Sequence, residues 1–285
     1  MWKTWLIMLL FVVFITTIVY VFSKAMGFDI SLVGIALILS GITSIGSYYY
    51  SDKLVLATSG AKQIQKSDYP QYFRIVENLS IASGLPMPKI YVVNDDSPNA
   101  FATGRDPKHA VVCATTGILS MLNESELEGV IAHELSHIKN YDIRLMGIVA
   151  ILVGFIAIAA NIFMRSLWFR GDDDDRNSNQ IFLIVGIFFA ILSPIIATLI
   201  QLAVSRKREL LADASGALLT RYPEGLANAL EKISNYPKPL KNANNATAHL
   251  FIINPFKGKD AKTWFSGLFN THPPIEERIK ILRSM

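Results

Sequence analysis

The sequence predicts a mainly α-helical membrane protein with a small β-sheet. Its mean hydropathy is +0.35, and 51% of its 285 residues are hydrophobic while only 18% are charged. That composition is too apolar for an ordinary soluble domain. Four uncharged apolar runs are each long enough to cross a hydrocarbon layer of ~30 Å, at residues 5–22, 30–50, 145–164 and 181–205. The chain is therefore expected to be a multi-pass protein of a lipid bilayer.

The four runs divide the chain into parts. Residues 1–50 and 145–205 are expected to form two transmembrane hairpins, and residues 51–144 and 206–285 to form the two halves of one polar domain. Two alternatives exist: the first run could be a cleaved signal peptide, and the last two could form a buried hairpin in a soluble core. Few basic residues precede the first run, which is unlike a signal peptide, and the last two runs are long enough to span. Both observations favour membrane spans.

Basic residues near the ends of the runs predict the orientation. Lys3, the segment after Tyr50 and the cluster Arg206-Lys207-Arg208 lie on one side if all four runs span. The positive-inside rule makes that side cytoplasmic. Both halves of the polar domain are then expected at the cytoplasmic face of the plasma membrane, on the same side as each other.

Charge and cysteine content exclude some classes of protein. The net charge is only +4, and no Lys/Arg run is interleaved with aromatic residues as a nucleic-acid groove would need, so no nucleic-acid partner is expected. Cys113 is the single cysteine, which rules out an internal disulfide. It stands in an apolar run, where a buried thiol is expected.

The sequence H-E-L-S-H at residues 133–137 carries the strongest chemical signal. Asn123 and Glu126 have the spacing of a capping box, and the residues that follow have an apolar stripe at helical spacing. On a helix His133 and His137 share one face, where they can hold two of the tetrahedral positions of a zinc ion. Glu134 lies about 100° round the helix, better placed to take a proton from water than to bind the metal. The alternative is an ordinary amphipathic helix that carries two histidines.

A catalytic zinc takes three protein ligands, so a third residue is needed. Glu209 and Asp213 are four residues apart on a predicted helix just after the fourth run, and a hairpin of runs three and four returns them to the surface that carries the histidines. Glu209 is the candidate ligand, and Asp213 could accept the free N–H of a zinc-bound histidine. Asp142 competes, but it follows the histidine helix directly and is expected to have difficulty turning back. A surface ion-pair helix with Arg206 and Arg208 is the alternative for this segment.

A small sheet is expected before the histidine helix. Residues 89–94 and 109–115 are rich in β-branched and apolar residues, and residues 98–104 form a short segment with turn residues at both ends.

Three motifs together resemble the HtpX-type membrane zinc metalloproteases, relatives of the CAAX prenyl endopeptidases. They are H-E-L-S-H at 133–137, S-R-K-R-E-L-L-A-D at 205–213 and T-H-P-P at 271–274. The resemblance implies a gluzincin-like metalloprotease domain interrupted by a transmembrane hairpin. It also implies one Zn2+ per chain on His133, His137 and Glu209, with Glu134 as the catalytic base and Asp213 as an outer partner.

The same resemblance implies further site residues and a role. Asn99, Ala100 and Phe101 are expected near the cleft on an edge strand that receives an extended substrate, and His272 near the site, where it could steady an oxyanion. The implied function is an endopeptidase that hydrolyses peptide bonds of polypeptide substrates, chiefly membrane proteins, in quality control and stress response.

Two other functions are compatible with the motifs. One is a prenyl-protein processing endopeptidase, because these motifs do not distinguish that activity from the HtpX type. The other is a non-catalytic membrane scaffold that keeps a metal site, although a closed structural site usually has four ligands that include cysteine. The sequence assigns no role to Asp172–Asp175, and leaves substrates, regulation and oligomeric state open.

Overall fold

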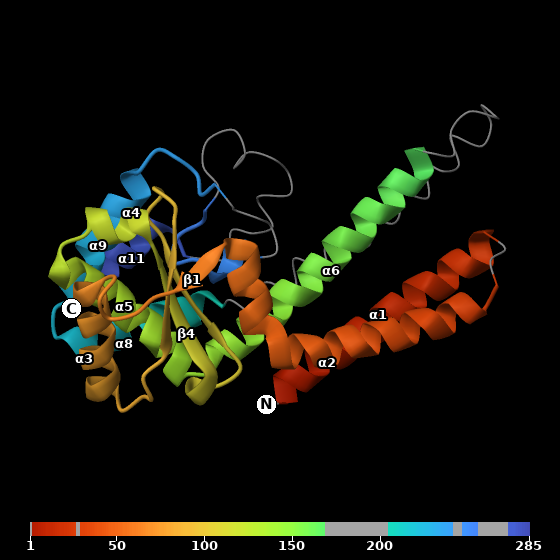
Figure 1. Ribbon diagram of the computed structural model, residues 1–285, viewed down its shortest axis with the longest axis horizontal. Coiled ribbons are helices and arrows are strands. Elements are labelled where there is room, and N and C mark those ends of the chain that lie inside the picture. The colour runs from red at the N-terminus through yellow and green to blue at the C-terminus, as the bar shows by residue number, and fades with distance from the viewer. Residues whose placement is uncertain (1, 27–28, 169–204, 242–246, 256–272) are drawn as a thin grey trace.

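The computed structural model describes residues 2–26, 29–168, 205–241, 247–255 and 273–285 (Figure 1). A globular part contains a sheet surrounded by helices, and three long helices project from it as a stalk. The predicted fold class, mainly helical with a small sheet, is confirmed. Almost all of the fourth predicted run, together with Asp172–Asp175 and His272, falls outside the described residues.

The sheet has four strands in the order β1-β2-β4-β3. Strands β2 and β4 are parallel, and the other two neighbouring pairs are antiparallel. The strands span Ala61–Gln63 (β1), Lys89–Val93 (β2), Ala100–Gly104 (β3) and Ala110–Thr115 (β4). The sequence indicated β2, β3 and β4 but not β1, because a three-residue strand is too short to show alternation. Strand β3 lies at one edge of the sheet.

The globular part contains six helices among the described residues. They are α3 (Pro70–Ser83), α4 (Thr116–Met121), α5 (Glu124–Lys139), α8 (Arg206–Thr220), α9 (Pro223–Asn235) and α11 (Ile275–Leu282). There are also two 3₁₀ turns, Pro107–His109 between β3 and β4, and Ala248–Leu250 between α9 and α11 in the sequence. Helix α5 is central: it packs against α3, α8, α9 and β3 and is buried on all sides from Gly129 to Ile138. A helix enclosed in this way is held rigidly, because its neighbours fix every face.

Two glycines allow the helices to approach α5 closely. A Cβ at Gly129 would lie 2.6 Å from the backbone nitrogen of Leu226 in α9, and a Cβ at Gly216 of α8 would lie 3.0 Å from the backbone nitrogen of His133. A side chain at either position would push the neighbouring helix away. Gly216 therefore sets α8 directly against the part of α5 that carries the histidines.

The ends of α5 are well defined. The predicted capping box is confirmed: the Asn123 side chain accepts from the Glu126 N–H, and the Glu126 carboxylate accepts from the Asn123 N–H. The other end is followed by Tyr141, which has φ 60°. This left-handed conformation is rare for a bulky residue, and it turns the chain sharply into α6, which begins at Asp142.

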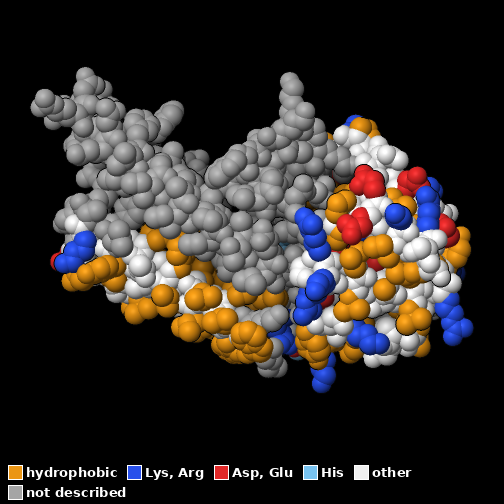
Figure 2. Space-filling model, turned by 180° about the vertical axis from the view of Figure 1, so that it is seen from behind, with side chains coloured by type: hydrophobic (Ala, Val, Ile, Leu, Met, Phe, Trp, Pro, Cys, Tyr) orange, Lys and Arg blue, Asp and Glu red, His pale blue; other side chains and the backbone are white. Residues whose placement is uncertain are grey.

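The stalk consists of α1 (Trp2–Met26), α2 (Ser31–Ser59) and α6 (Asp142–Trp168). Helices α1 and α2 run side by side and leave many large apolar residues exposed along their length (Figure 2). Within the described residues α2 is the one helix long and apolar enough to cross a membrane, and Thr4–Tyr20 of α1 is a shorter apolar helix. The second predicted run lies in α2, which continues to Ser59, and the third lies in α6. That all four runs cross a bilayer stays a prediction.

Candidate metal centre

The centre is built where α5 crosses α8. Helix α5 contributes His133, Glu134 and His137, and α8 contributes Glu209 and Asp213, and all five side chains are buried. Glu209 and Asp213 are each only 1% exposed. The interpretation of the α8 carboxylates as a surface ion-pair face is therefore wrong, since both point into the protein toward α5.

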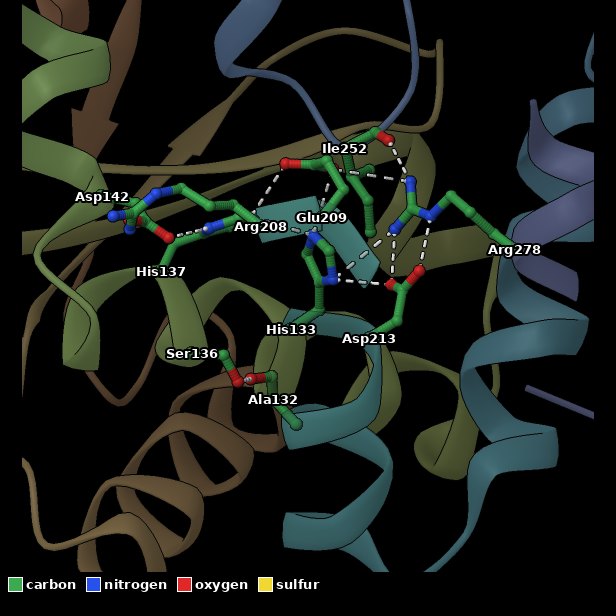
Figure 3. Close-up of polar contacts among 10 residues, drawn as sticks. All are labelled: Ala132, His133, Ser136, His137, Asp142, Arg208, Glu209, Asp213, Ile252 and Arg278. Carbon is green, nitrogen blue, oxygen red and sulfur yellow. Dashed lines mark hydrogen bonds and ion pairs between the residues drawn. The ribbon is translucent and has the colours of Figure 1, made fainter. Parts of the chain in front are cut away.

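Three potential ligand atoms face one another in this crossing (Figure 3). The Nε2 atoms of His133 and His137 are 3.1 Å apart. Glu209 places Oε1 3.3 Å from Nε2 of His137 and Oε2 3.8 Å from Nε2 of His133. Ligands about 2.0–2.1 Å from a tetrahedral zinc ion lie about 3.3 Å from each other. The spacing of the three side chains therefore suits one ion of that size.

The partners of the outer ring nitrogens, Nδ1, explain why a cation fits between the two histidines and Glu209. Nδ1 of His133 lies 2.9 Å from Asp213 Oδ1, and Nδ1 of His137 lies 3.1 Å from Asp142 Oδ2. A carboxylate beside Nδ1 holds the ring proton there, so Nε2 is left with its lone pair. Two such lone pairs and the Glu209 carboxylate then point at one another. Three acceptors in a dry site repel unless a cation lies among them.

Asp142 was expected to have difficulty turning back to a metal held by the histidine helix, and it is not among the three facing groups, but its carboxylate does return to the site behind His137. The left-handed Tyr141 reverses the chain between α5 and α6, so Asp142 returns to the ring of His137. Arg208 of α8 donates to the other oxygen of Asp142. Asp142 is thus not one of the three facing groups, but it orients His137 in the way that Asp213 orients His133.

The sequence did not single out Arg278, which the structure places at the centre. It lies on α11, is 0% exposed, and binds Asp213 with two parallel bonds: Nε to Oδ2 at 2.8 Å and a terminal nitrogen to Oδ1 at 2.7 Å. Its other terminal nitrogen donates to the carbonyl of Ile252 at 3.0 Å. Burial raises the pKa of Asp213, but the charge of Arg278 and the bonds from His133 and Arg278 outweigh it and lower that pKa to about 2. Asp213 is therefore held as a carboxylate behind His133.

Replacing Arg278 with Met is expected to weaken zinc binding and activity together. The substitution leaves the buried Asp213 charge uncompensated, a change that typically costs about 3–5 kcal/mol. Arg278→Lys keeps the charge but loses the bidentate hydrogen bonding to Asp213, so an intermediate loss of zinc binding and activity is expected. Zinc affinity is measured by competition with a coloured chelator, with Arg283→Met as the control. Arg283 lies five residues further on and pairs with the exposed Glu224 and Glu231. Unchanged zinc affinity in Arg278→Met would show that Arg278 has no influence on the centre.

Glu134 lies between the facing ligands and the edge strand. Its carboxylate accepts a bond from the Ala102 N–H of β3. Burial is the main reason that the pKa of Glu134 is raised to about 7, and the neighbouring Glu209 charge adds to it. A carboxyl group with a pKa near neutrality can both take up and release a proton at physiological pH.

The predicted substrate residues lie along the start of β3. Asn99 immediately precedes the strand, and its side chain donates to the Ile253 carbonyl at 3.0 Å. The Ala100 carbonyl accepts from the Ile252 N–H at 3.0 Å, while Phe101 packs against Phe251. This end of the strand is thus covered by residues 251–253, whereas Ala102 faces Glu134. His272, the remaining predicted site residue, is outside the described residues.

A helix with the H-E-x-x-H spacing, combined with a carboxylate from a second helix, is typical of metallopeptidases. Residues 67–285 match Peptidase family M48, and the chain belongs to that family. The resemblance to HtpX-type proteases is thereby confirmed, and membership classes the chain as a membrane metalloprotease.

Relatives and a solved structure agree with this assignment. The chain is 48% identical over 285 residues to "Protease HtpX homolog" of Dictyoglomus thermophilum, covering 99% of this chain and 91% of the relative. It is 46% identical to the protein of the same name from Caldanaerobacter subterraneus subsp. tengcongensis, covering 99% and 94%. The fold is similar to the crystal structure of S. mikatae Ste24p, with a TM-score of 0.51, 18% identity, and coverage of 99% of this chain and 67% of that one.

Proposed function

We propose that the protein is a zinc-dependent endopeptidase of the plasma membrane that cleaves unfolded segments of membrane proteins at the cytoplasmic face. One observation carries the proposal: two imidazoles, each held from behind by a carboxylate, face the Glu209 carboxylate beside a buried glutamate. His133, His137 and Glu209 would hold the zinc ion. The role in quality control is taken from the resemblance to HtpX-type proteases, and the test below therefore compares folded with unfolded substrate.

The chemistry is divided among this chain's own residues. Zinc, when bound, supplies a Lewis acid that polarises the scissile carbonyl and lowers the pKa of water. Glu134 takes a proton from the attacking water and delivers it to the leaving amine. Asp213 and Asp142 hold the imidazoles in one tautomer. Arg278 keeps Asp213 ionised and ties it to Ile252, whose N–H binds the edge strand at Ala100.

We place the substrate on the part of β3 nearest Glu134. Residues in an antiparallel strand direct alternate backbone groups to each side. The Asn99 carbonyl bonds to Thr115 of β4, so the backbone groups of Ala100, Ala102 and Gly104 face away from β4. Residues 251–253 cover Ala100, so an extended peptide would pair with Ala102 and Gly104. Both residues are buried in this structure, and the peptide would displace the bond from the Ala102 N–H to Glu134. The proposal shifts the substrate edge two residues beyond the Asn99–Phe101 segment expected from the sequence.

The orientation of the protein in the membrane is proposed from the positions of the basic residues and of the stalk. The exposed apolar side chains of α1 and α2 end where the globular part begins, so the globular part lies on one side of any bilayer that covers the stalk. The positive-inside rule makes that side cytoplasmic.

One vesicle experiment tests activity, metal dependence and orientation together. Inside-out membrane vesicles that contain the protein are incubated with a soluble, permanently unfolded polypeptide. Cleavage is expected without detergent, is expected to stop on addition of a membrane-impermeant chelator, and is expected to return on addition of zinc. Right-side-out vesicles are expected to cleave only after detergent is added. A folded soluble protein of similar length is expected to stay intact.

Three results would contradict the proposal. Cleavage that resists the chelator would mean that no exchangeable metal is used. Cleavage by intact right-side-out vesicles would reverse the orientation. An absence of cleavage in every preparation, by protein that contains zinc, would favour a non-catalytic scaffold.

A further inference from the structure

Aromatic and basic side chains gather where the stalk meets the globular part. We call this group the basal patch. It comes from α1, α2, the turn after β3 and the beginning of α6, and its members are Trp5, Tyr48, Tyr49, Tyr50, Lys53, Arg105, Tyr141 and Arg144. None of these residues takes part in the metal centre.

Each cation of the basal patch lies over a tyrosine ring. The guanidinium of Arg144 is 6.0 Å from the Tyr48 ring centre and 5.1 Å from that of Tyr141. Arg105 lies 5.7 Å from the Tyr49 ring centre. Such contacts hold a long basic side chain in place without neutralising its charge, and Arg105 is in addition ion-paired with Asp106. The patch is therefore a positioned set of charges rather than a group of mobile ones.

The remaining members complete the same arrangement. The Lys53 ammonium lies 5.3 Å from the ring centre of Tyr50. Trp5 stacks on Tyr48 with ring centres 5.9 Å apart, so α1 contributes to the patch as well. Tyr49, Tyr50 and Trp5 are between 52% and 57% exposed. The aromatic rings are thus available to a partner from outside.

The surroundings of the basal patch define the kind of partner. On one side lie the exposed apolar residues of the stalk, and on the other the charged surface of the globular part (Figure 2). Tyr and Trp with this exposure are typical of the headgroup level of a bilayer, where basic side chains attract anionic lipids. Two carboxylates in the same segments are already engaged. Asp106 accepts from the Lys108 and His109 N–H groups and is ion-paired with Arg105, and Asp142 pairs with Arg208.

We propose that the basal patch binds the headgroup of an anionic phospholipid, with Arg105 and Lys53 facing the phosphate and the buried Arg144 holding the Arg105 backbone from behind. A guanidinium has five N–H donors, and it binds phosphate oxygens with two at a time. The described contacts leave part of the Arg105 guanidinium free: Nε lies 3.6 Å from Asp106 Oδ2, and one terminal nitrogen lies 2.9 Å from a His109 ring nitrogen. Arg144 donates Nε to the Arg105 carbonyl. The inference rests on the proposed membrane location, and its consequence for activity rests on the proposed protease function.

A lipid at the basal patch would connect two elements of the metal centre. Arg105 follows the last residue of β3, the strand whose Ala102 faces Glu134. Arg144 lies two residues after Asp142, which holds His137. The bond from Arg144 to the Arg105 carbonyl joins these two elements at the patch. A phosphate bound to Arg105, whose carbonyl accepts from Arg144, would hold the β3 turn against α6, and anionic lipid is therefore expected to stabilise the protein and to raise its activity.

The test is thermal unfolding of the purified protein in detergent micelles with added phosphatidylglycerol or phosphatidylcholine. Specific binding of phosphatidylglycerol at saturating concentration is expected to raise Tm by about 5 °C more than phosphatidylcholine does. The double variant Arg105→Gln, Lys53→Gln is expected to lose this difference. Arg74→Gln is the matched control, because Arg74 is an exposed cation on α3, away from the stalk, and it is expected to keep the difference.

Each other result overturns the inference. Equal shifts with both lipids would show that the headgroup charge is not recognised. A retained difference in the double variant would place recognition elsewhere, and an equal shift with inorganic phosphate would indicate a site for free anions. The unfolding measurement does not require proteolysis, so it separates the two proposals. A selective shift in a protein that cleaves nothing would support lipid binding while contradicting the protease assignment.

Discussion

Replacing Glu134 with Gln is expected to reduce peptide hydrolysis by about 10²–10⁴-fold, the usual contribution of a general base. Gln has nearly the same shape, and its amide oxygen can still accept the bond from the Ala102 N–H, so the packing of the buried site is expected to be kept. The amide cannot take up a proton at neutral pH. Zinc content is expected to stay at the wild-type value because no ligand is removed.

The measurement compares cleavage rate and zinc content of the same preparation. Glu128→Gln is the control, because Glu128 lies on the same helix but is partly exposed and outside the centre. That variant is expected to retain wild-type activity. Near-normal turnover by Glu134→Gln would remove Glu134 from its proposed role, whereas loss of zinc would show that it acts as a ligand.

Replacing Glu209 with Ala is expected to give a protein that purifies largely without zinc and is inactive. Glu209 is the third member of the set that it forms with His133 and His137, and two imidazoles alone hold the ion weakly. Asp213→Asn is expected to behave differently. It keeps an oxygen acceptor for His133, and loss of an outer partner typically costs about 10–100-fold in affinity or activity. Measurable zinc is therefore expected in Asp213→Asn.

Metal analysis after gel filtration distinguishes these two residues, and far-ultraviolet circular dichroism checks that both variants keep their helices. Arg278 is expected to lose most of its ionic interaction with Asp213 in the Asn variant, so its Tm is recorded as well. Stoichiometric zinc in Glu209→Ala together with none in Asp213→Asn would reverse the proposed assignment of ligand and outer partner.

The part of the site that the sequence predicted well depends on local periodicity. The spacing of His133 and His137 brings them together on any α-helix, and the capping box at Asn123 and Glu126 marked where that helix begins. Helix α8 was predicted by similar reasoning, since Glu209 and Asp213, four residues apart, share one face of a helix. In each case the relevant geometry lies within a few residues of the chain.

The part that sequence reasoning missed depends on tertiary structure. Asp142 reaches His137 only because Tyr141 adopts a left-handed conformation, and nothing about a tyrosine signals that. Arg278 follows Glu276 and Glu277, a pattern typical of an exposed helix face, yet the packing of α11 against α8 and α9 buries its guanidinium completely. Its one sequence signal was its position shortly after the T-H-P-P motif.

We propose above all that one zinc ion is bound by His133, His137 and Glu209. X-ray absorption at the zinc edge of the purified wild-type protein tests that claim most directly. The predicted result is one zinc per chain, with two imidazole nitrogens at about 2.0–2.1 Å and oxygen in the remaining positions. A sulfur ligand, which only Cys113 or a methionine could supply, or a protein that is active without bound metal, would contradict it.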